Sequence, residues 1–449
     1  MQCVTKRRWL ILLVETKARE LYAKMLLALV AAEQGWGVVL GSKSALRNVQ
    51  AYLPRGTFLE KGVTPSMATN VERGRALGHR VSALCEEGLL YFATEEYLDL
   101  QSFEAIDYFF AWGARQAADV RSVIEGGYEK VVVSGNPRLD LVRPEWRGIF
   151  EQGAKQIREQ YGSIILVNTK FPTVNHIVRT IGDYTDHLKA SGKIGSREHE
   201  ARWRRYVALQ GRVFPCVLDL LPALSHAFKG HTIILRPHPS EDNAPWFEKA
   251  KGLSNVKVVW EGNVLEWITA ADVVLQSNCF TGVEACLLGK PSISYRPFKD
   301  EMVEFEIPRK AGLQASTQAE VLSLVQGVLC GDATVRGLAS VEPEATGQYI
   351  ANVDGRLASD VIMETLSTLD LPLCEGRFPI RPNGVAGALT RLKVLPIVKS
   401  MLTYNRKKFR RLDLAEMERL RADFQQVSGR FTDVEITQAT DDGFCVYRP

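Results

Sequence analysis

Residues 270–295, AADVVLQSNCFTGVEACLLGKPSISY, decide the fold class of this chain. An apolar run enters a polar turn, and a helix-like stretch then leads to a second strand-like run. Residues 233–242, IILRPHPSED, begin the same way, and their strand must end where Pro237 and Pro239 bar a regular ladder. Strands and helices in alternation predict an α/β protein with parallel sheets, which bind ligands at the carboxyl ends of their strands.

The same alternation runs through most of the chain and predicts two α/β domains and an appendage. We expect domains over residues 1–150 and 151–345, and a C-terminal extension over 346–449. The polar segment 172–205 is expected to be a long loop or insertion, with a helix over Tyr206–Phe228 after it. Strands are expected within 8–15, 36–42, 57–62, 80–88, 107–113, 130–140, 163–171, 231–239, 255–262, 272–278 and 291–297, and near the C-terminus within 442–449.

Composition indicates a soluble globular protein. Of its 449 residues, 46% are hydrophobic and 24% are charged, and the net charge of +4 requires no nucleic-acid partner. The eight cysteines lack metal-ligand spacing, so we expect reduced thiols and no metal. The apolar run at 9–14 ends at Glu15, which suits a strand better than a signal peptide, and no stretch predicts a transmembrane helix. We therefore expect a cytoplasmic protein.

Polar side chains gather where the strand of 232–236 should end. Arg236 can offer a charged fork to a phosphate, and His238 can donate to a phosphate or carboxylate oxygen. Ser240 lies in the same turn. The alternative is a histidine that only bonds to its own loop, but the flanking polar residues argue against an apolar core position.

The turn Ser277–Gly282 and the helix after it form a second candidate anion site. Free N–H groups at a helix start attract anions, and Ser277, Asn278 and Thr281 add polar side chains. Glu284 lies about one turn into the helix, where it can accept hydrogen bonds from ribose hydroxyls. The alternative is a capping box, since Thr281 and Glu284 have that spacing.

Strand ends in the first half also carry polar residues. Glu86 and Glu87 follow an apolar strand, at a place that suits a general base or nucleophile, although a solvated loop carboxylate would look the same. The other cleft or acceptor-side candidates are Glu15, Lys17, Arg19, Glu20, Asn136, Arg138 and Asp140. No GxGxxG, GxxxxGK[ST] or GxSxG pattern occurs, which counts against NAD, P-loop and α/β-hydrolase chemistry.

The segment Lys393–Arg411 is strongly basic with interleaved apolar residues. It suits a solvated helix face, or peripheral contact with an anionic membrane surface or an acidic glycan.

Seven collinear motifs together resemble the surface-carbohydrate biosynthesis proteins, which are GT-B-like glycosyltransferases of bacterial surface polysaccharide assembly. The resemblance covers most of residues 8–300. The motifs are LLVETKARELYAKMLLAL (12–29), CEEGL (85–89), YFFAWG (108–113), VSGNPRLDLVRP (133–144), ILVNTKF (165–171), RPHPSED (236–242) and AADVVLQSNCFTGVEACLLGKPSISYRP (270–297).

This resemblance implies two Rossmann-like domains facing a central cleft, a helical and basic C-terminal extension, and no cofactor or obligatory metal. The His-Pro and SNCxTG-type turns look similar to those of retaining β-Kdo transferases, which use CMP-Kdo. Carried over by motif, His238 would touch the donor phosphate or carboxylate, Ser277–Gly282 would hold phosphate, and Glu284 would hold ribose. Glu87 is the implied catalytic carboxylate.

The sequence therefore predicts transfer of a sugar, with Kdo or a related acid from a CMP-sugar favoured, to a glycan or lipid-linked acceptor. One alternative keeps the fold and predicts a CDP-glycerol-type phosphotransferase or a nucleotide-sugar epimerase. Another is a non-catalytic scaffold that binds nucleotide or glycan.

Overall fold

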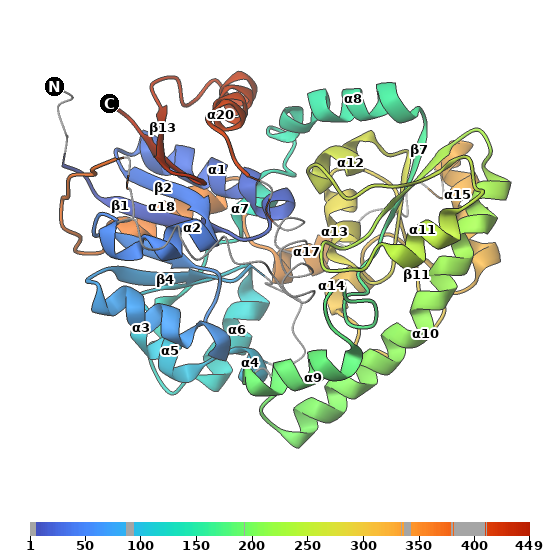
Figure 1. Cartoon of the computed structure of the whole chain (residues 1–449), viewed down its shortest axis with the longest axis horizontal. Coiled ribbons are helices and arrows are strands. Elements are labelled where there is room, and N and C mark those ends of the chain that lie inside the picture. Colours follow the sequence, from blue (N-terminus) through green and yellow to red (C-terminus); the bar gives the residue numbers. More distant parts are fainter. Residues whose placement is uncertain are drawn as a thin grey trace, which may run out of the picture. The chain divides into compact units, whose positions relative to one another are not determined.

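The computed structural model describes residues 6–86, 94–192, 194–333, 335, 343–378, 380, 409 and 411–449. They form two compact units, shown in Figure 1. The first contains the described residues up to Trp146 and those from Gln348 onward, and the second spans Arg147–Gly347. The described residues of the predicted C-terminal extension from Gln348 onward thus belong to the first unit. The basic segment Lys393–Arg411 lies, but for residues 409 and 411, outside the described residues.

The first unit is built on one sheet. Over the described residues the sheet has eight strands in the order β13-β14-β2-β1-β3-β4-β5-β6, and β1 to β6 pair in parallel. The C-terminal hairpin of β13 and β14 extends it by antiparallel pairing of β14 with β2. The strands are β1 (Trp9–Val14), β2 (Gly37–Ser42), β3 (Thr57–Glu60), β4 (Arg80–Leu84), β5 (Phe109–Ala111), β6 (Val131–Val133), β13 (Glu435–Thr440) and β14 (Gly443–Tyr447).

Strand β1 is central, and all six of its residues are buried, as expected for a parallel strand covered on both faces. Helix α1 packs on β1 and β2, and residues from Leu21 to Ala32 supply most of its buried face. The α-helices described in this unit are α1 (Lys17–Glu33), α2 (Lys43–Asn48), α3 (Ala68–Ala76), α4 (Thr94–Tyr97), α5 (Leu100–Ala105), α6 (Ala114–Val123), α7 (Pro137–Asp140), α18 (Ala358–Ser367) and α20 (Leu414–Ser428), and α17 (Pro343–Tyr349) crosses the boundary between the units.

The second unit holds a parallel sheet of six described strands in the order β12-β11-β10-β7-β8-β9. The strands are β7 (Ile164–Asn168), β8 (Thr232–Arg236), β9 (Val256–Val258), β10 (Val273–Gln276), β11 (Ser292–Tyr295) and β12 (Leu313–Ala315). The helices are α8 (Glu151–Tyr161), α9 (Ile181–Ala190), α10 (Arg197–Ala227), α11 (Ala244–Ala250), α12 (Val264–Ala270), α13 (Phe280–Leu287), α14 (Glu306–Arg309) and α15 (Gln318–Leu329).

Helix α10 supplies much of the core on one face of this sheet. Its Leu220, Leu221 and Leu224 are buried in one cluster with Ile165 and Leu235 of β7 and β8. Among the described helices, α10 has the length and composition to cross a membrane. Because its inner side chains belong to this cluster, we interpret it as a helix that packs on the sheet of the second unit.

The predicted loop over 172–205 is wrong in part. It contains α9, which begins with a capping box between Thr180 and Asp183. Helix α10 begins at Arg197 instead of Tyr206, because the Ser196 hydroxyl caps its first turn. Exposed charged residues along both helices hid the helical period from a reading by hydrophobicity. The strand predicted within 442–449 is confirmed by β14, and α20 precedes the C-terminal hairpin.

Candidate functional site

The order of strands in the second sheet reverses beside β7. The chain steps from β7 to β8 and β9 on one side and then returns to place β10, β11 and β12 on the other. The crevice outside the carboxyl ends of β7 and β10 is therefore the topological switch point, where open α/β sheets bind ligands. Lys170 follows β7, and the turn that starts at Ser277 follows β10 directly.

Hydrogen bonds within the turn after β8 determine which ring nitrogen of His238 carries the proton. The backbone N–H of Ser240 donates to His238 Nδ1 over 3.2 Å. A ring nitrogen that accepts has no proton, so the neutral ring is protonated on Nε2. His238 is partly buried. Its Nε2–H suits donation to a phosphate or carboxylate oxygen.

Glu241 anchors this turn and was not among the predicted site residues. The side chain is fully buried. Its Oε1 accepts from Thr169 Oγ1 at 2.7 Å, from the Phe171 N–H at 2.9 Å and from the His238 N–H at 3.1 Å. Its Oε2 accepts from Trp246 Nε1 at 3.0 Å. Burial raises the pKa of Glu241, and these hydrogen bonds oppose the rise. One carboxylate thus joins the segments after β7 and β8 to α11.

The turn after β10 has a specific backbone conformation. Asn278 has φ of 48°, a left-handed value that asparagine tolerates better than most residues. Its side chain donates to the Phe305 carbonyl at 2.9 Å and accepts from the Phe305 N–H at 2.8 Å. The amide of Asn278 therefore fixes the turn against the segment before α14. The side chain of Asn278 therefore holds this turn in place through contacts within the protein.

Gln276 holds the start of α13. Its Oε1 accepts from the N–H of Cys279, which is the N-cap residue, at 2.7 Å. Gly282 permits this arrangement, because a Cβ there would lie 2.6 Å from Gln276 Nε2. The glycine is thus required by a close approach in this helix and not by its backbone angles.

The other predicted residues of this turn lie on or beside α13. Ser277 is buried, and Thr281 is partly buried with its hydroxyl oxygen enclosed and unbonded among the described residues. Glu284 is completely buried on the first turns of the helix. The structure brings these residues together beyond β10, on the edge of the sheet that carries His238.

Lys170 is the second residue that the sequence reasoning missed. Its Nζ lies 3.5 Å from Asn278 Oδ1 and 4.3 Å from the centre of the Phe305 ring. Burial lowers the pKa of Lys170 to about 8, while Cys279 and Glu304 act to raise it. A lysine directly across the switch point from a helix start is suited to bind an anion.

Arg236 is used inside the fold. Its guanidinium donates to the carbonyls of Glu261 at 2.5 Å and Gly262 at 3.0 Å, and it lies over the ring of Trp267 at 4.9 Å. Burial lowers the pKa of Arg236 to about 9. The predicted phosphate fork is therefore better described as a brace for the loop after β9.

In the first unit, charged groups fill the switch point beside β1. Lys61 follows β3, and its Nζ lies 3.0 Å from Glu15 Oε2 and 2.9 Å from Glu20 Oε1. Lys24 lies 2.8 Å from Glu86 Oε1. Burial acts to raise the pKa of Glu20, but Lys24 and Lys61 outweigh it and hold that pKa at about 2. Glu20 is thus an ionised partner in a network and a poor general base near neutral pH.

Two other predicted residues near α1 also take part in ion pairs. Lys17 pairs with Glu416 of α20 at 2.6 Å, and this contact ties α1 to the C-terminal helix. Arg19 lies 3.5 Å from Glu20 Oε1. Both contacts lie within the first unit, and the acceptor-side roles of Lys17 and Arg19 remain predictions. Glu87 lies outside the described residues, and its catalytic role remains a prediction.

The GNPRLD segment has a packing role as well. Asn136 Oδ1 accepts from the Arg138 N–H at 2.9 Å and caps α7. Asp140 is fully buried and accepts from the N–H groups of Ala358 at 2.8 Å and Ser359 at 3.0 Å at the start of α18. Burial raises the pKa of Asp140 to about 6 against these bonds. The structure therefore corrects the predicted cleft role of Asp140, which is a cap for α18.

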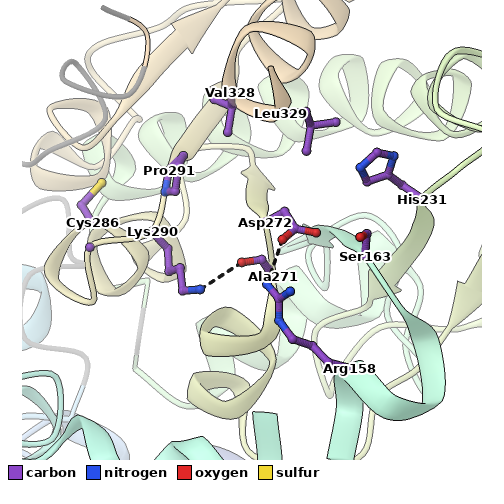
Figure 2. Close-up of a pocket in the computed structure, with 11 residues that line it drawn as sticks. Arg158, Ser163, His231, Ala271, Asp272, Cys286, Lys290, Pro291, Val328 and Leu329 are labelled. Atoms are coloured by element: carbon purple, nitrogen blue, oxygen red, sulfur yellow. Dashed lines mark hydrogen bonds and ion pairs between the residues drawn. The ribbon is translucent and has the colours of Figure 1, made fainter. Parts of the chain in front are cut away.

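A cavity of 570 Å³ opens at the opposite edge of the second sheet (Figure 2). Its lining includes Ser163, His231 and Pro291, which directly precede β7, β8 and β11. Lys290 in the same lining donates to the Ala271 carbonyl at 3.2 Å. This edge carries the amino ends of the strands, so the cavity is separate from the site around His238. Within the described residues no cluster of three or more metal-ligating side chains occurs.

No family model and no curated protein matches this chain. Among solved structures, the wall teichoic acid polymerase TagF has 11% identity and a TM-score of 0.52, covering 80% of this chain and 88% of its own. A TagF variant soaked with CDPG gives the same identity and TM-score over 80% and 87%. A UDP-GlcNAc 2-epimerase from Neisseria meningitidis, bound to UDP-GlcNAc, has 13% identity and a TM-score of 0.49 over 80% and 100%. The likeness to TagF shows the fold: the chain is a GT-B-like α/β protein with two Rossmann-like domains.

Proposed function

We propose that this protein is a glycosyltransferase of bacterial surface polysaccharide biosynthesis. It transfers a sugar from a nucleotide donor to a glycan or lipid-linked acceptor, and Kdo or a related acid from a CMP-sugar is the favoured donor. The observation that supports this function is the carboxyl-edge site of the second unit. There His238 follows β8, and the start of α13 and the buried Glu284 follow β10, the two strands that flank β7.

The proposed chemistry places charge where this site can stabilise it. Breaking the anomeric bond of the donor builds positive charge on the sugar and negative charge on the leaving phosphate. Nε2–H of His238 and the N–H groups at the start of α13 would donate to that phosphate. Glu284 would accept from ribose hydroxyls. Arg236 supports this site indirectly, because it braces the neighbouring loop.

The acceptor hydroxyl needs a carboxylate, for which Glu87 remains our candidate. In an inverting enzyme this carboxylate would take the hydroxyl proton, and in a retaining enzyme it would attack the anomeric carbon. Glu20 and Asp140 are less suitable, since the first is held ionised by two lysines and the second caps a helix.

A thermal-shift screen against CMP, UDP, GDP, CDP-glycerol and CMP-Kdo tests the donor. A ligand at about 100 times its Kd stabilises the native state by about 2.7 kcal/mol, so the nucleotide base can be identified directly. In a transfer assay His238→Ala should abolish turnover without loss of folding. His231→Ala, in the cavity of Figure 2, is the matched control and should keep it. Wild-type turnover by purified His238→Ala would show that the donor site is assigned wrongly.

A phosphotransferase that uses CDP-glycerol is the second candidate, favoured by the structural likeness to TagF. Both reactions release CMP, but only the phosphotransferase adds phosphorus from the donor to the acceptor. Phosphorus analysis of the product from each donor therefore separates the two. A non-catalytic scaffold would instead bind nucleotide and show no turnover with any donor.

A further inference from the structure

The surroundings of Lys170 favour the binding of an anion. Among the described residues its hydrogen-bond partner is the amide oxygen Asn278 Oδ1 at 3.5 Å, a long distance for a hydrogen bond. Within the described residues no carboxylate forms an ion pair with it. Glu304, the carboxylate whose charge acts on Lys170, already holds Arg296 with both oxygens at 2.6 Å. Lys170 is partly buried. An ammonium that is partly removed from water without an ion-pair partner is costly, and a bound anion lowers that cost.

The surroundings of Lys170 come from several elements. The Phe305 ring lies beneath the ammonium group, and the ring of Tyr206 from α10 lies 5.9 Å away. Burial raises the pKa of the Tyr206 hydroxyl, so that neighbour stays neutral. Cys279 at the start of α13 and Glu304 are the groups whose negative charge would act on Lys170. Among the described groups named here, Lys170 is thus the cationic one at the crevice between β7 and β10.

Glu241 fixes the chain on both sides of Lys170. Its Oε1 accepts from Thr169 Oγ1 and the Phe171 N–H, and the same oxygen accepts from the His238 N–H. Lys170 and His238 are thus held by one buried carboxylate, although they lie on segments that follow different strands. Such a shared anchor is what a site with two donors to one ligand requires.

We propose that Lys170 binds a phosphate oxygen of the nucleotide donor and neutralises the leaving phosphate during transfer. This inference rests on the proposed function and adds to it the cation of the site. In the step, the anomeric C–O bond breaks and its electron pair stays on the phosphate oxygen. The acceptor oxygen forms the new bond, and its proton goes to the acceptor-side carboxylate. Lys170 keeps its proton throughout and donates to the leaving oxygen.

Nucleotide affinity measured by calorimetry tests this assignment. The probes are CMP and UDP, with cytidine and uridine as matched nucleosides that lack phosphate. Lys170→Met should bind the nucleotides about 10- to 100-fold more weakly than wild type and the nucleosides equally well. Lys290→Met is the control, since Lys290 is also partly buried with a pKa lowered by burial but lies at the opposite edge of the sheet (Figure 2). It should bind both kinds of probe like wild type.

A pH series adds a readout that a merely structural role would not change. Burial lowers the pKa of Lys170 to about 8, so the wild type should lose nucleotide affinity as the pH rises from about 7 to about 9.5. The probes' own phosphates have a second pKa of about 6, so they are already about 90% ionised at pH 7 and change little over that range. Lys170→Arg keeps its charge and should hold its affinity at the high end, while Lys170→Met should be weak throughout.

Three results would overturn the assignment. Lys170→Met could bind CMP and UDP like wild type, it could lose nucleosides and nucleotides alike, or Lys170→Arg could show the wild-type pH dependence. If wild type binds neither nucleotide while remaining folded, the proposed function itself fails, and the Lys170 inference fails with it. The first three outcomes leave nucleotide binding intact in the wild type, so the two failures are distinguishable.

Discussion

Replacing Glu241 by glutamine should weaken the second unit measurably. Glutamine keeps the shape of the side chain and one carbonyl oxygen, which can occupy the place of Oε1 and accept from Thr169, Phe171 and His238. The amide nitrogen must then face Trp246 Nε1, and both groups are donors. In the wild type this indole nitrogen donates to Glu241 Oε2 at 3.0 Å. The hydrogen bond from Trp246 is therefore lost, and the three at the Oε1 position are made to a neutral amide oxygen instead of a carboxylate.

The expected cost follows from these contacts. Leaving a buried indole N–H unbonded costs about 1–3 kcal/mol, and neutral hydrogen bonds contribute about 1 kcal/mol less than those to a charged group. Burying a charge is costly, and this cost is the reason why the pKa of Glu241 is raised. Glu241→Gln removes the charge and its cost, which offsets part of the loss. We expect a net loss of about 2 kcal/mol. For a unit of about 200 residues this lowers the melting temperature by about 4–8 °C.

Hydrogen exchange detected by mass spectrometry during heating can measure the stability of each unit separately. Peptides that contain Thr169–Phe171 and Trp246 should exchange faster in Glu241→Gln, and nucleotide affinity should fall. Glu248→Gln is the control, because Glu248 is an exposed carboxylate on the same helix, α11. If Glu241→Gln melts and exchanges like wild type, the carboxylate is not the anchor that its contacts indicate.

Three further changes test other parts of the structure. Gly282→Ala should displace the Gln276 side chain. Nucleotide binding should then weaken at least tenfold, which corresponds to the loss of about one hydrogen bond to a bound anion. Titration of the variant with CMP measures this loss of affinity. Burial lowers the pKa of His79 to about 4, so the first unit should lose stability as the pH falls from about 6.5 to about 4, and chemical unfolding of His79→Gln should lack this dependence. Bound nucleotide should slow alkylation of Cys279 beside Lys170 but not that of the exposed Cys330, as mapped by mass spectrometry.

Features carried by one continuous stretch could be predicted from the sequence. The apolar runs of β7, β8 and β10 identify buried parallel strands, and the prolines on both sides of His238 show where β8 ends. The polar turn at Ser277–Gly282 likewise predicts that a helix, α13, begins there. In each case the hydrophobic pattern and the turn residues agree, so local sequence is enough.

Features that depend on partners distant in sequence could not be predicted. Glu241 looks like any polar residue of a turn, and its importance comes from Thr169 and Phe171, about 70 positions earlier. Arg236 looks like a ligand residue until the carbonyls of Glu261 and Gly262 are seen to occupy it. Charge and hydrogen-bonding capacity are visible in a sequence, but the group that satisfies them is decided by the fold.

The two switch points balance their charges differently, and this difference argues for the place where an anion binds. Lys61, beside β3, is paired with Glu15 and with the buried Glu20 at 3.0 and 2.9 Å. An anion that approached Lys61 would have to displace carboxylates already in contact, one of which has a pKa held at about 2 by its lysines. Lys170, beside β7, meets an amide oxygen at 3.5 Å and an aromatic face. An anion at Lys170 would supply a counter-charge that no carboxylate among the described residues provides through an ion pair, and this difference supports our proposal that the second unit holds the nucleotide phosphate.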